Sequence, residues 1–265
     1  EKLTQLKELS LLHNPDLTKA QIEQLQKAIP NCRIHSNPKE KQQEVKEEAK
    51  PEEPVSETKP PEAVSVSPNL KYEVEDDAVT ITGCDKKASG ALTIPATIEG
   101  KTVTSIGDRA FDNCSSLTSI TIGNGVTSIG RDAFCLCTSL TSISIPDGVT
   151  SIGEGAFSYC YRLTSVEVGA GNVNYTEVNG VLFNAEKTVL HTYPGGKTGD
   201  NYNIPNSVTS IGESAFWDCT SLTSITIPDG VTSIGEAAFN RCSSLTSITI
   251  PTASPASGVL LSAAA

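Results

Sequence analysis

The stretch VTSIGEAAFNRCSSLTSITIP, Val231–Pro251, repeats almost unchanged a stretch that begins at Val208. The same VTSIG word also starts at Val103, Val126 and Val149, and neighbouring copies within each group are 23 residues apart. Val149 and Val208 are 59 residues apart, which is one repeat plus 36 extra residues. A fixed period of about 20 to 50 residues is typical of solenoids, in which each repeat forms one turn of the fold.

Each copy contains two apolar words joined by turn residues. The first is Leu-x-x-Ile-x-Ile, for example Leu117, Ile120 and Ile122, and its alternation of β-branched and polar residues is typical of a half-buried strand. Pro or Gly follows, and Asn-Gly or Asp-Gly pairs supply turn chemistry. The second word is VTSIG, after which Ala-Phe-x-x-Cys turns the chain through a compact turn or a single helical turn. An imperfect sixth unit precedes the five copies at Val79–Gly100. Because one unit buries its apolar face only against its neighbours, we expect the units to stack.

These words resemble a known family. Leu-x-x-Ile-x-Ile is similar to the strand of a leucine-rich repeat, and LTSITIPDGVTSIGEAAFNRC closely resembles the BspA-like subclass of bacterial and protist surface proteins. The resemblance covers about Tyr72 to Thr252. It implies an α/β leucine-rich repeat solenoid, rich in β structure, with a curved parallel sheet on its concave face. It also implies a surface protein without enzymatic activity, and some relatives bind host matrix or plasma proteins.

The N-terminal residues 1–36 follow a different pattern, which resembles the terminal repeat of a conventional leucine-rich array. Thr18 is a predicted helix N-cap, Gln21 completes a capping box, and Pro30 ends the helix. The strand that precedes this helix is predicted from Leu6-x-x-Leu9-x-Leu11-x-x-Asn14. One such repeat is expected to be marginally stable by itself.

The rest of the chain divides by composition. Residues 37–69 are dominated by Glu, Lys and Pro without periodicity, which predicts a disordered, acidic linker. The solenoid is expected over residues 70–252, with the insertion at about 170–207. Residues 253–265 are predicted to be a low-complexity tail.

The formal net charge of −11 argues against nucleic acid as a partner, because nucleic-acid binding needs a basic surface. No apolar run approaches the roughly 18 residues of a membrane span. No leader is visible at the N-terminus, but the chain starts at Glu1 and contains no methionine, so we expect a fragment or a processed product.

A cysteine stands three residues after the phenylalanine of every copy, at Cys114, Cys137, Cys160, Cys219 and Cys242. Metal ligands and a disulfide ladder are the functional interpretations, but no Cys-x-x-Cys pair of the kind typical of zinc sites occurs. We therefore expect these cysteines to pack as small core residues, and we predict no metal and no cofactor.

Catalytic motifs are not evident. None of the three histidines, His13, His35 and His191, lies in a recognisable catalytic motif, and neither H-E-x-x-H nor G-x-S-x-G occurs. The expectation is a protein that is not an enzyme. An undescribed enzyme that uses His191 and Glu167 remains a remote alternative.

Two surfaces are candidates for binding a partner protein. Residues between the buried isoleucines should point outward as a ladder of hydroxyl groups. The ladder either binds a partner protein or consists only of soluble residues that are compatible with a strand. The insertion carries Tyr175, His191 and Tyr193, and it is either a binding element or an ordinary long repeat that forms a small hairpin or meander. The ladder residues are Ser119, Thr121, Ser142, Ser144, Ser165, Glu167, Ser224, Thr226, Ser247 and Thr249.

The favoured hypothesis is a cell-surface or secreted protein that binds other proteins, including host extracellular proteins, without catalysis. The alternative is an intracellular scaffold or regulatory module, which the many cysteines would suit because thiols stay reduced inside cells.

Overall fold

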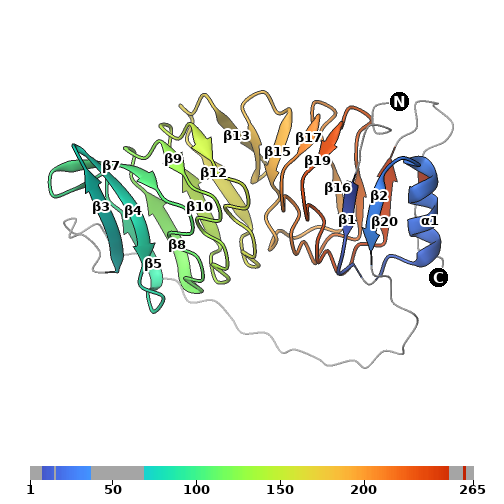
Figure 1. Cartoon of the computed structure of the whole chain (residues 1–265), viewed down its shortest axis with the longest axis horizontal. Coiled ribbons are helices and arrows are strands. Elements are labelled where there is room, and N and C mark those ends of the chain that lie inside the picture. The colour runs from blue at the N-terminus through green and yellow to red at the C-terminus, as the bar shows by residue number, and fades with distance from the viewer. Residues whose placement is uncertain (1–7, 15, 37–68, 251–258, 261–265) are drawn as a thin grey trace.

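The computed structural model describes residues 8–14, 16–36, 69–250 and 259–260, and it shows an elongated stack of coils (Figure 1). Within these residues the only helix is α1 (Lys19–Ala28). We number the coils of the five sequence copies first to fifth, by their starts at Val103, Val126, Val149, Val208 and Val231. The expected linker, apart from residue 69, and most of the expected tail lie outside the described residues.

The Leu-x-x-Ile-x-Ile words form parallel strands, as predicted. In the first half of the solenoid they build a four-stranded sheet in the order β12-β10-β8-β5, in which neighbouring strands are one repeat apart. Its strands are β5 (Ser89–Ile94), β8 (Ser116–Ile122), β10 (Ser142–Ile145) and β12 (Ser165–Val168).

The VTSI words build a second sheet, in the order β11-β9-β7-β4-β3. The imperfect sixth unit is part of the same stack, because β4 and β5 pair in parallel with strands of the first coil. The antiparallel strand β3 closes this end of the solenoid, and β6 pairs antiparallel with β7. The strands are β3 (Leu70–Glu75), β4 (Ala78–Cys84), β6 (Thr97–Ile98), β7 (Lys101–Ile106), β9 (Ser128–Ile129) and β11 (Ser151–Ile152).

The insertion contains the predicted meander and also a complete coil. Strands β13 (Tyr175–Val178), β14 (Val181–Asn184) and β15 (Val189–Thr192) pair antiparallel in sequence order. The chain then rejoins the stack, since β15 pairs in parallel with β17 and β16 with β18. We call residues 181–207 the inserted coil. The remaining strands are β16 (Asn201–Asn203), β17 (Ser210–Ile211), β18 (Ser224–Thr226), β19 (Ser233–Ile234), β20 (Ser247–Ile250) and the antiparallel β21 (Val259–Leu260).

The hydrophobic core divides at strand β14, which is buried on both of its faces. Leu182 belongs to the cluster of the first half, whereas Val181 and Phe183 belong to the cluster of the second half. Successive side chains of a strand point to opposite faces, so this strand separates the two cores. We call the boundary between the third coil and the inserted coil the seam.

Regular contacts join each coil to the next. The phenylalanine rings stack, with centroids 5.2 Å apart for Phe111 and Phe134 and 5.0 Å apart for Phe216 and Phe239. The five cysteines of the column are free and buried, which confirms the packing interpretation. Four of the five thiols also donate hydrogen bonds to carbonyl oxygens of the preceding coil, as the Sγ of Cys137 does to Phe111 at 3.2 Å.

The threonines of the repeat also donate side-chain hydrogen bonds to the preceding coil. The Oγ1 of Thr141 donates to the carbonyl oxygen of Thr118, one coil earlier, at 3.1 Å, and the Oγ1 of Thr164 donates to that of Thr141 at 3.0 Å. The hydroxyl of Thr150 repeats this bond in the second sheet. These threonines therefore stabilise the stack and are not part of the candidate ladder.

The N-terminal unit consists of β1 (Glu8–Leu11), α1 and β2 (Arg33–Ser36), and β1 pairs with β2 in parallel. The predicted capping box is present: the Thr18 side chain accepts from the backbone N–H of Gln21. The unit lies at the C-terminal end of the solenoid, beside β20 (Figure 1), and its leucines belong to the core cluster of the second half. The sequence had not indicated this position.

Candidate functional site

The structure brings the candidate ladder residues together as two surfaces. In the first half Ser119, Ser142 and Ser165 are in register across β8, β10 and β12, and beside them lie Thr121, Ser144 and Glu167. Thr121, Ser144 and Glu167 are exposed, and the three serines are half-buried.

The second-half surface is not continuous with the first, because β12 and β16 belong to different sheets. Here Ser224 pairs with Ser247 and Thr226 with Thr249, and all four residues are half-buried. Two residues that sequence analysis missed extend these columns. They are Asn201 and Asn203, which pair with Ser224 and Thr226. Aligning the insertion as a repeat would have found them, since the spacing from Asn201 to Ser224 is 23 residues.

Two of the candidate aromatic residues of the insertion belong to the core. Tyr193 occupies the phenylalanine position of the inserted coil, where its ring stacks on Phe216 at 5.3 Å and is 3% exposed. Tyr175 is 8% exposed, and its hydroxyl accepts a hydrogen bond from the backbone N–H of Ile152 at 2.8 Å. Tyr175 thus contacts the third coil and Tyr193 the fourth, and both side chains have little surface for a partner.

His191 occupies a position that is glycine in the other coils. Leu190 pairs with Ile211, so the next residues, His191 and Gly212, are equivalent. At Gly153 of the third coil the stacking excludes a side chain, since a Cβ there would lie 2.6 Å from the carbonyl carbon of Gly130. The inserted coil accommodates an imidazole here because His191 and Gly153 of the third coil line a common cavity at the seam.

This cavity has a volume of about 210 Å³ and is lined from both halves of the solenoid. The third coil contributes Glu154 and Ser158, the inserted coil contributes His191, and the fourth coil contributes Glu213 and Ser214. Carboxylates, hydroxyls and an imidazole can bind a small polar group by hydrogen bonds.

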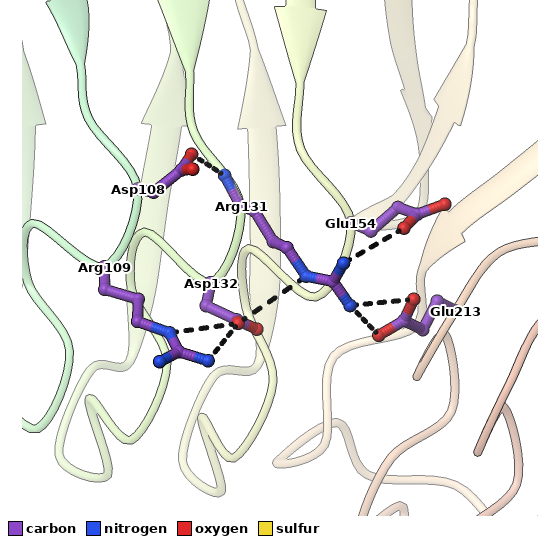
Figure 2. Close-up of polar contacts among 6 residues, drawn as sticks. All are labelled: Asp108, Arg109, Arg131, Asp132, Glu154 and Glu213. Carbon is purple, nitrogen blue, oxygen red and sulfur yellow. Dashed lines mark hydrogen bonds and ion pairs between the residues drawn. The ribbon is translucent and has the colours of Figure 1, made fainter.

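Arg131 of the second coil pairs with two carboxylates that line this cavity, those of Glu154 and Glu213 (Figure 2). Its guanidinium lies 3.0 Å from a Glu213 oxygen and 3.8 Å from a Glu154 oxygen. A second arginine, Arg109, lies 3.4 Å from Asp132. These charges therefore form a continuous network along one edge of the solenoid (Figure 2).

The surroundings of the cavity shift two pKa values. Burial lowers the pKa of the His191 imidazole below its ordinary value, which favours the neutral ring. Burial also raises the pKa of the Glu213 carboxyl, while Arg131 acts in the opposite direction. Loss of water is the largest cause of both pKa shifts, and the neighbouring carboxylates of Glu154 and Glu236 also raise the pKa of Glu213.

A second contact that sequence analysis missed crosses the seam on the turn side. The rings of Tyr159 and Trp217 lie 4.5 Å apart, although the inserted coil passes between their coils. That coil has Pro194, Gly195 and Gly196 at its turn, and a Cβ on Gly196 would lie 2.6 Å from the carbonyl carbon of Arg162. The glycines thus make the inserted turn thin enough for the two aromatic rings to meet.

Glu167 and His191, the pair considered for catalysis, are not brought together. Glu167 is exposed on β12, whereas His191 lines the cavity at the seam and lies in a different sheet. Among the described residues no group of three or more histidine, cysteine, aspartate or glutamate side chains could hold a metal ion. A search of the same residues finds no helix long and apolar enough to cross a membrane.

Comparison with known proteins agrees with this architecture. The model of the BspA type leucine rich repeat region matches six copies at residues 91–192 and 196–257, which is more than half of the chain. No curated protein matches the chain.

Solved structures of bacterial leucine-rich repeat proteins are also similar. A leucine-rich repeat protein of T. pallidum is 28% identical, with 68% of this chain and 78% of that chain covered and a TM-score of 0.48. A leucine rich cell surface protein of Faecalibacterium prausnitzii is 25% identical, with coverages of 69% and 75% and a TM-score of 0.37. A leucine-rich repeat protein of Eubacterium ventriosum is 24% identical, with coverages of 71% and 72% and a TM-score of 0.42.

Proposed function

The chain belongs to the BspA-type leucine-rich repeat family, and from that premise we propose that it is a non-catalytic cell-surface or secreted protein that binds other proteins. The observation that carries the proposal is the outer column of the first-half sheet. Thr121, Ser144 and Glu167 are exposed and lie side by side in register, so they offer a smooth surface rich in hydrogen-bonding groups. Stacked repeats use such extended surfaces for binding.

The charge of the chain narrows the partner class. With a net charge of −11, the chain favours proteins with basic surfaces, because complementary charge steers association. We expect these partners among extracellular matrix and plasma proteins of a host.

A matched pair of lysine substitutions tests the binding surface. Ser144→Lys places a long cation in the exposed column, and Ser151→Lys makes the same change on the exposed β11 strand of the other sheet of the stack. We expect surface plasmon resonance against a panel of matrix and plasma proteins to show at least about tenfold weaker binding for Ser144→Lys only. Absence of binding to the whole panel, or equal effects of both changes, would refute the proposed surface.

The cellular location is tested separately. Lys71, Lys86 and Lys87 are exposed, so a membrane-impermeant amine label should reach them on intact source cells if the protein is outside. Labelling only after lysis would instead support the second candidate function, an intracellular scaffold. The observation that favours this candidate is that all eight cysteines are free.

A further inference from the structure

The first, second and fourth coils each have backbone groups that bond to the next coil. Three such bonds recur at equivalent positions. The backbone N–H of a left-handed turn residue donates to a carbonyl of the next coil, as Asp218 does to Asn240 at 2.9 Å. The phenylalanine carbonyl accepts from the next cysteine, as Phe216 does from Cys242 at 3.0 Å. The carbonyl of a threonine accepts from the next threonine hydroxyl, as at Thr223 and Thr246.

Residues 251–265, which follow the fifth coil in this sequence, contain no VTSIG copy, so they do not supply the equivalent partners for the same three groups. They are the N–H of Arg241, the carbonyl of Phe239 and the carbonyl of Thr246. An unpaired backbone group that is buried costs free energy comparable to a lost hydrogen bond. The end of a solenoid therefore needs a cap.

The N-terminal unit supplies all three partners. The carbonyl of Leu12 accepts from the N–H of Arg241 at 3.1 Å. The Nδ2 of Asn14 donates to the carbonyl of Phe239 at 2.7 Å, in place of the next cysteine. The Nε2 of Gln21 donates to the carbonyl of Thr246 at 2.7 Å, in place of the next threonine hydroxyl.

Burial shows that these contacts form an interface and are not incidental surface bonds. Asn14 is 2% exposed and Gln21 is 3% exposed, which is rare for amide side chains unless they are hydrogen-bonded. Leu9, Leu11 and Leu25 belong to the same core cluster as Phe239 and Leu245 of the fifth coil. The unit thus buries its own leucines and the open end of the solenoid together.

Gln21 links the local fold of the unit to its docking. Its Oε1 accepts from the backbone N–H of Thr18 at 2.6 Å and so completes the capping box of α1. Its Nε2 remains free for the Thr246 carbonyl. One amide therefore fixes both the start of the helix and the position of the unit on the fifth coil.

We propose that the fifth coil, Val231–Ile250, is a docking site for a leucine-rich repeat unit, and that residues 8–36 of the same chain fill it as a separable cap that mimics the coil which would come next. The contacts are noncovalent, and the described residues of the cap and the fifth coil are more than 190 positions apart in the chain. Docking within the chain benefits from a high effective concentration, on the order of millimolar for a flexible connection. The docked face of the unit is not available to a partner protein.

Cleavage of the connecting segment tests whether the cap is held by these contacts. A specific protease site is inserted between Glu52 and Glu53 of the full chain, and the cleaved protein is passed over a gel-filtration column with light-scattering detection at low micromolar concentration. We expect one peak with the mass of a single chain that contains both fragments. Separation of the fragments, or a mass of two chains that indicates exchange with a second copy, would overturn the assignment.

Two isosteric variants test the docking geometry. Gln21→Glu keeps the acceptor of the capping box but removes the donor to Thr246 and places a carboxylate against its carbonyl. Gln24→Glu makes the same charge change at an exposed position of the same helix. We expect Gln21→Glu to weaken docking, so that the dissociation constant of the small fragment is about 10- to 100-fold higher than in the cleaved wild type. Gln24→Glu should leave this dissociation constant unchanged.

Asn14→Asp serves as a second variant, since it removes the donor to Phe239 while keeping the side-chain shape. We expect it to weaken the cap as Gln21→Glu does. Circular dichroism of the uncleaved variants confirms that the solenoid remains folded. Equal retention of the cap in Gln21→Glu, Asn14→Asp and Gln24→Glu would overturn the proposed docking.

Discussion

The guanidinium of Arg131 lies 3.0 Å from a carboxylate oxygen of Glu213, although the two residues are 82 positions apart in the chain (Figure 2). The contact ties the second coil to the fourth across the third coil and the inserted coil. It crosses the seam, where the hydrophobic core divides in two. The polar edge thus joins the two halves of the solenoid where their hydrophobic cores are separate.

The Arg131–Glu213 pair should contribute little to global stability. The Arg131 side chain is 55% exposed, so we expect Arg131→Gln to lower the free energy of unfolding by no more than about 1 kcal/mol. A double-mutant cycle with Glu213→Gln in urea denaturation should give a coupling of roughly 0.2 to 1 kcal/mol. Exposed Arg162 provides the control substitution Arg162→Gln. A coupling indistinguishable from that of the Arg162 control would show that the pair does not hold the seam.

A methyl group should be tolerated at Gly212 of the glycine column but not at Gly153. A Cβ on Gly153 would lie 2.6 Å from the carbonyl carbon of Gly130, whereas on Gly212 its nearest neighbour is the Leu190 carbonyl oxygen at 3.2 Å. We expect Gly153→Ala to cost about 3 kcal/mol and Gly212→Ala less than about 1 kcal/mol. Chemical denaturation of both variants measures the difference. Similar losses of stability in Gly153→Ala and Gly212→Ala would mean that the coils are evenly spaced.

The lowered pKa of His191 should make the protein less stable in mild acid. Between its folded pKa and the ordinary value of 6.5, the unfolded chain binds more protons than the folded one. The free energy of unfolding contributed by this group therefore falls as the pH decreases through 6.5 toward the folded pKa. As the pH is lowered from about pH 8 to about pH 5.5, the melting temperature of the wild type should therefore fall more than that of His191→Gln.

The sign of this effect separates it from that of Glu213 in the same cavity. Burial raises the pKa of Glu213, so its contribution favours the folded state as the pH falls through the raised value toward 4.5. Glu213→Gln should remove this gain in stability at lower pH. Parallel curves for the wild type and His191→Gln would contradict a desolvated imidazole at the seam.

Thiol reactivity should distinguish Cys135 from the cysteine column. Cys135 is half-buried, and burial raises its pKa to about 11, whereas the column cysteines are buried in the core. We expect a thiol reagent to modify Cys135 slowly and first in the native protein, and to reach all eight cysteines only after denaturation. Cys135→Ser should abolish the first phase. Rapid modification of several thiols in that variant would show that the column is accessible.

The repeat itself could be predicted because its stabilising contacts join equivalent positions of neighbouring copies. Leu117, Ile120 and Ile122 recur at a spacing that equals one turn, so the same pattern that identifies the strand also places its neighbour. The cysteine column follows from the same period, whereas the capping box of Thr18 and Gln21 depends on residues close together in sequence.

The seam was harder to predict because its residues are not alike in sequence. Tyr193 replaces phenylalanine, His191 replaces glycine and Asn201 replaces serine, so the inserted coil does not look like a repeat. Its equivalence becomes clear only from strand pairing, as between Leu190 and Ile211. The contacts of Arg131 with Glu213 and of Tyr159 with Trp217 depend on the width of that coil, which no pattern expresses.

The sequence by itself determined a parallel stack of leucine-rich repeats, because a 23-residue period with alternating isoleucines permits burial only between neighbouring copies. Only the tertiary structure decided where the stack is interrupted and how it ends. Those outcomes depend on backbone groups left without partners, such as the carbonyls of Phe239 and Thr246, which are satisfied by Asn14 and Gln21 from the opposite end of the chain. Backbone groups are the same at every residue, so their need for a partner is not visible in the sequence.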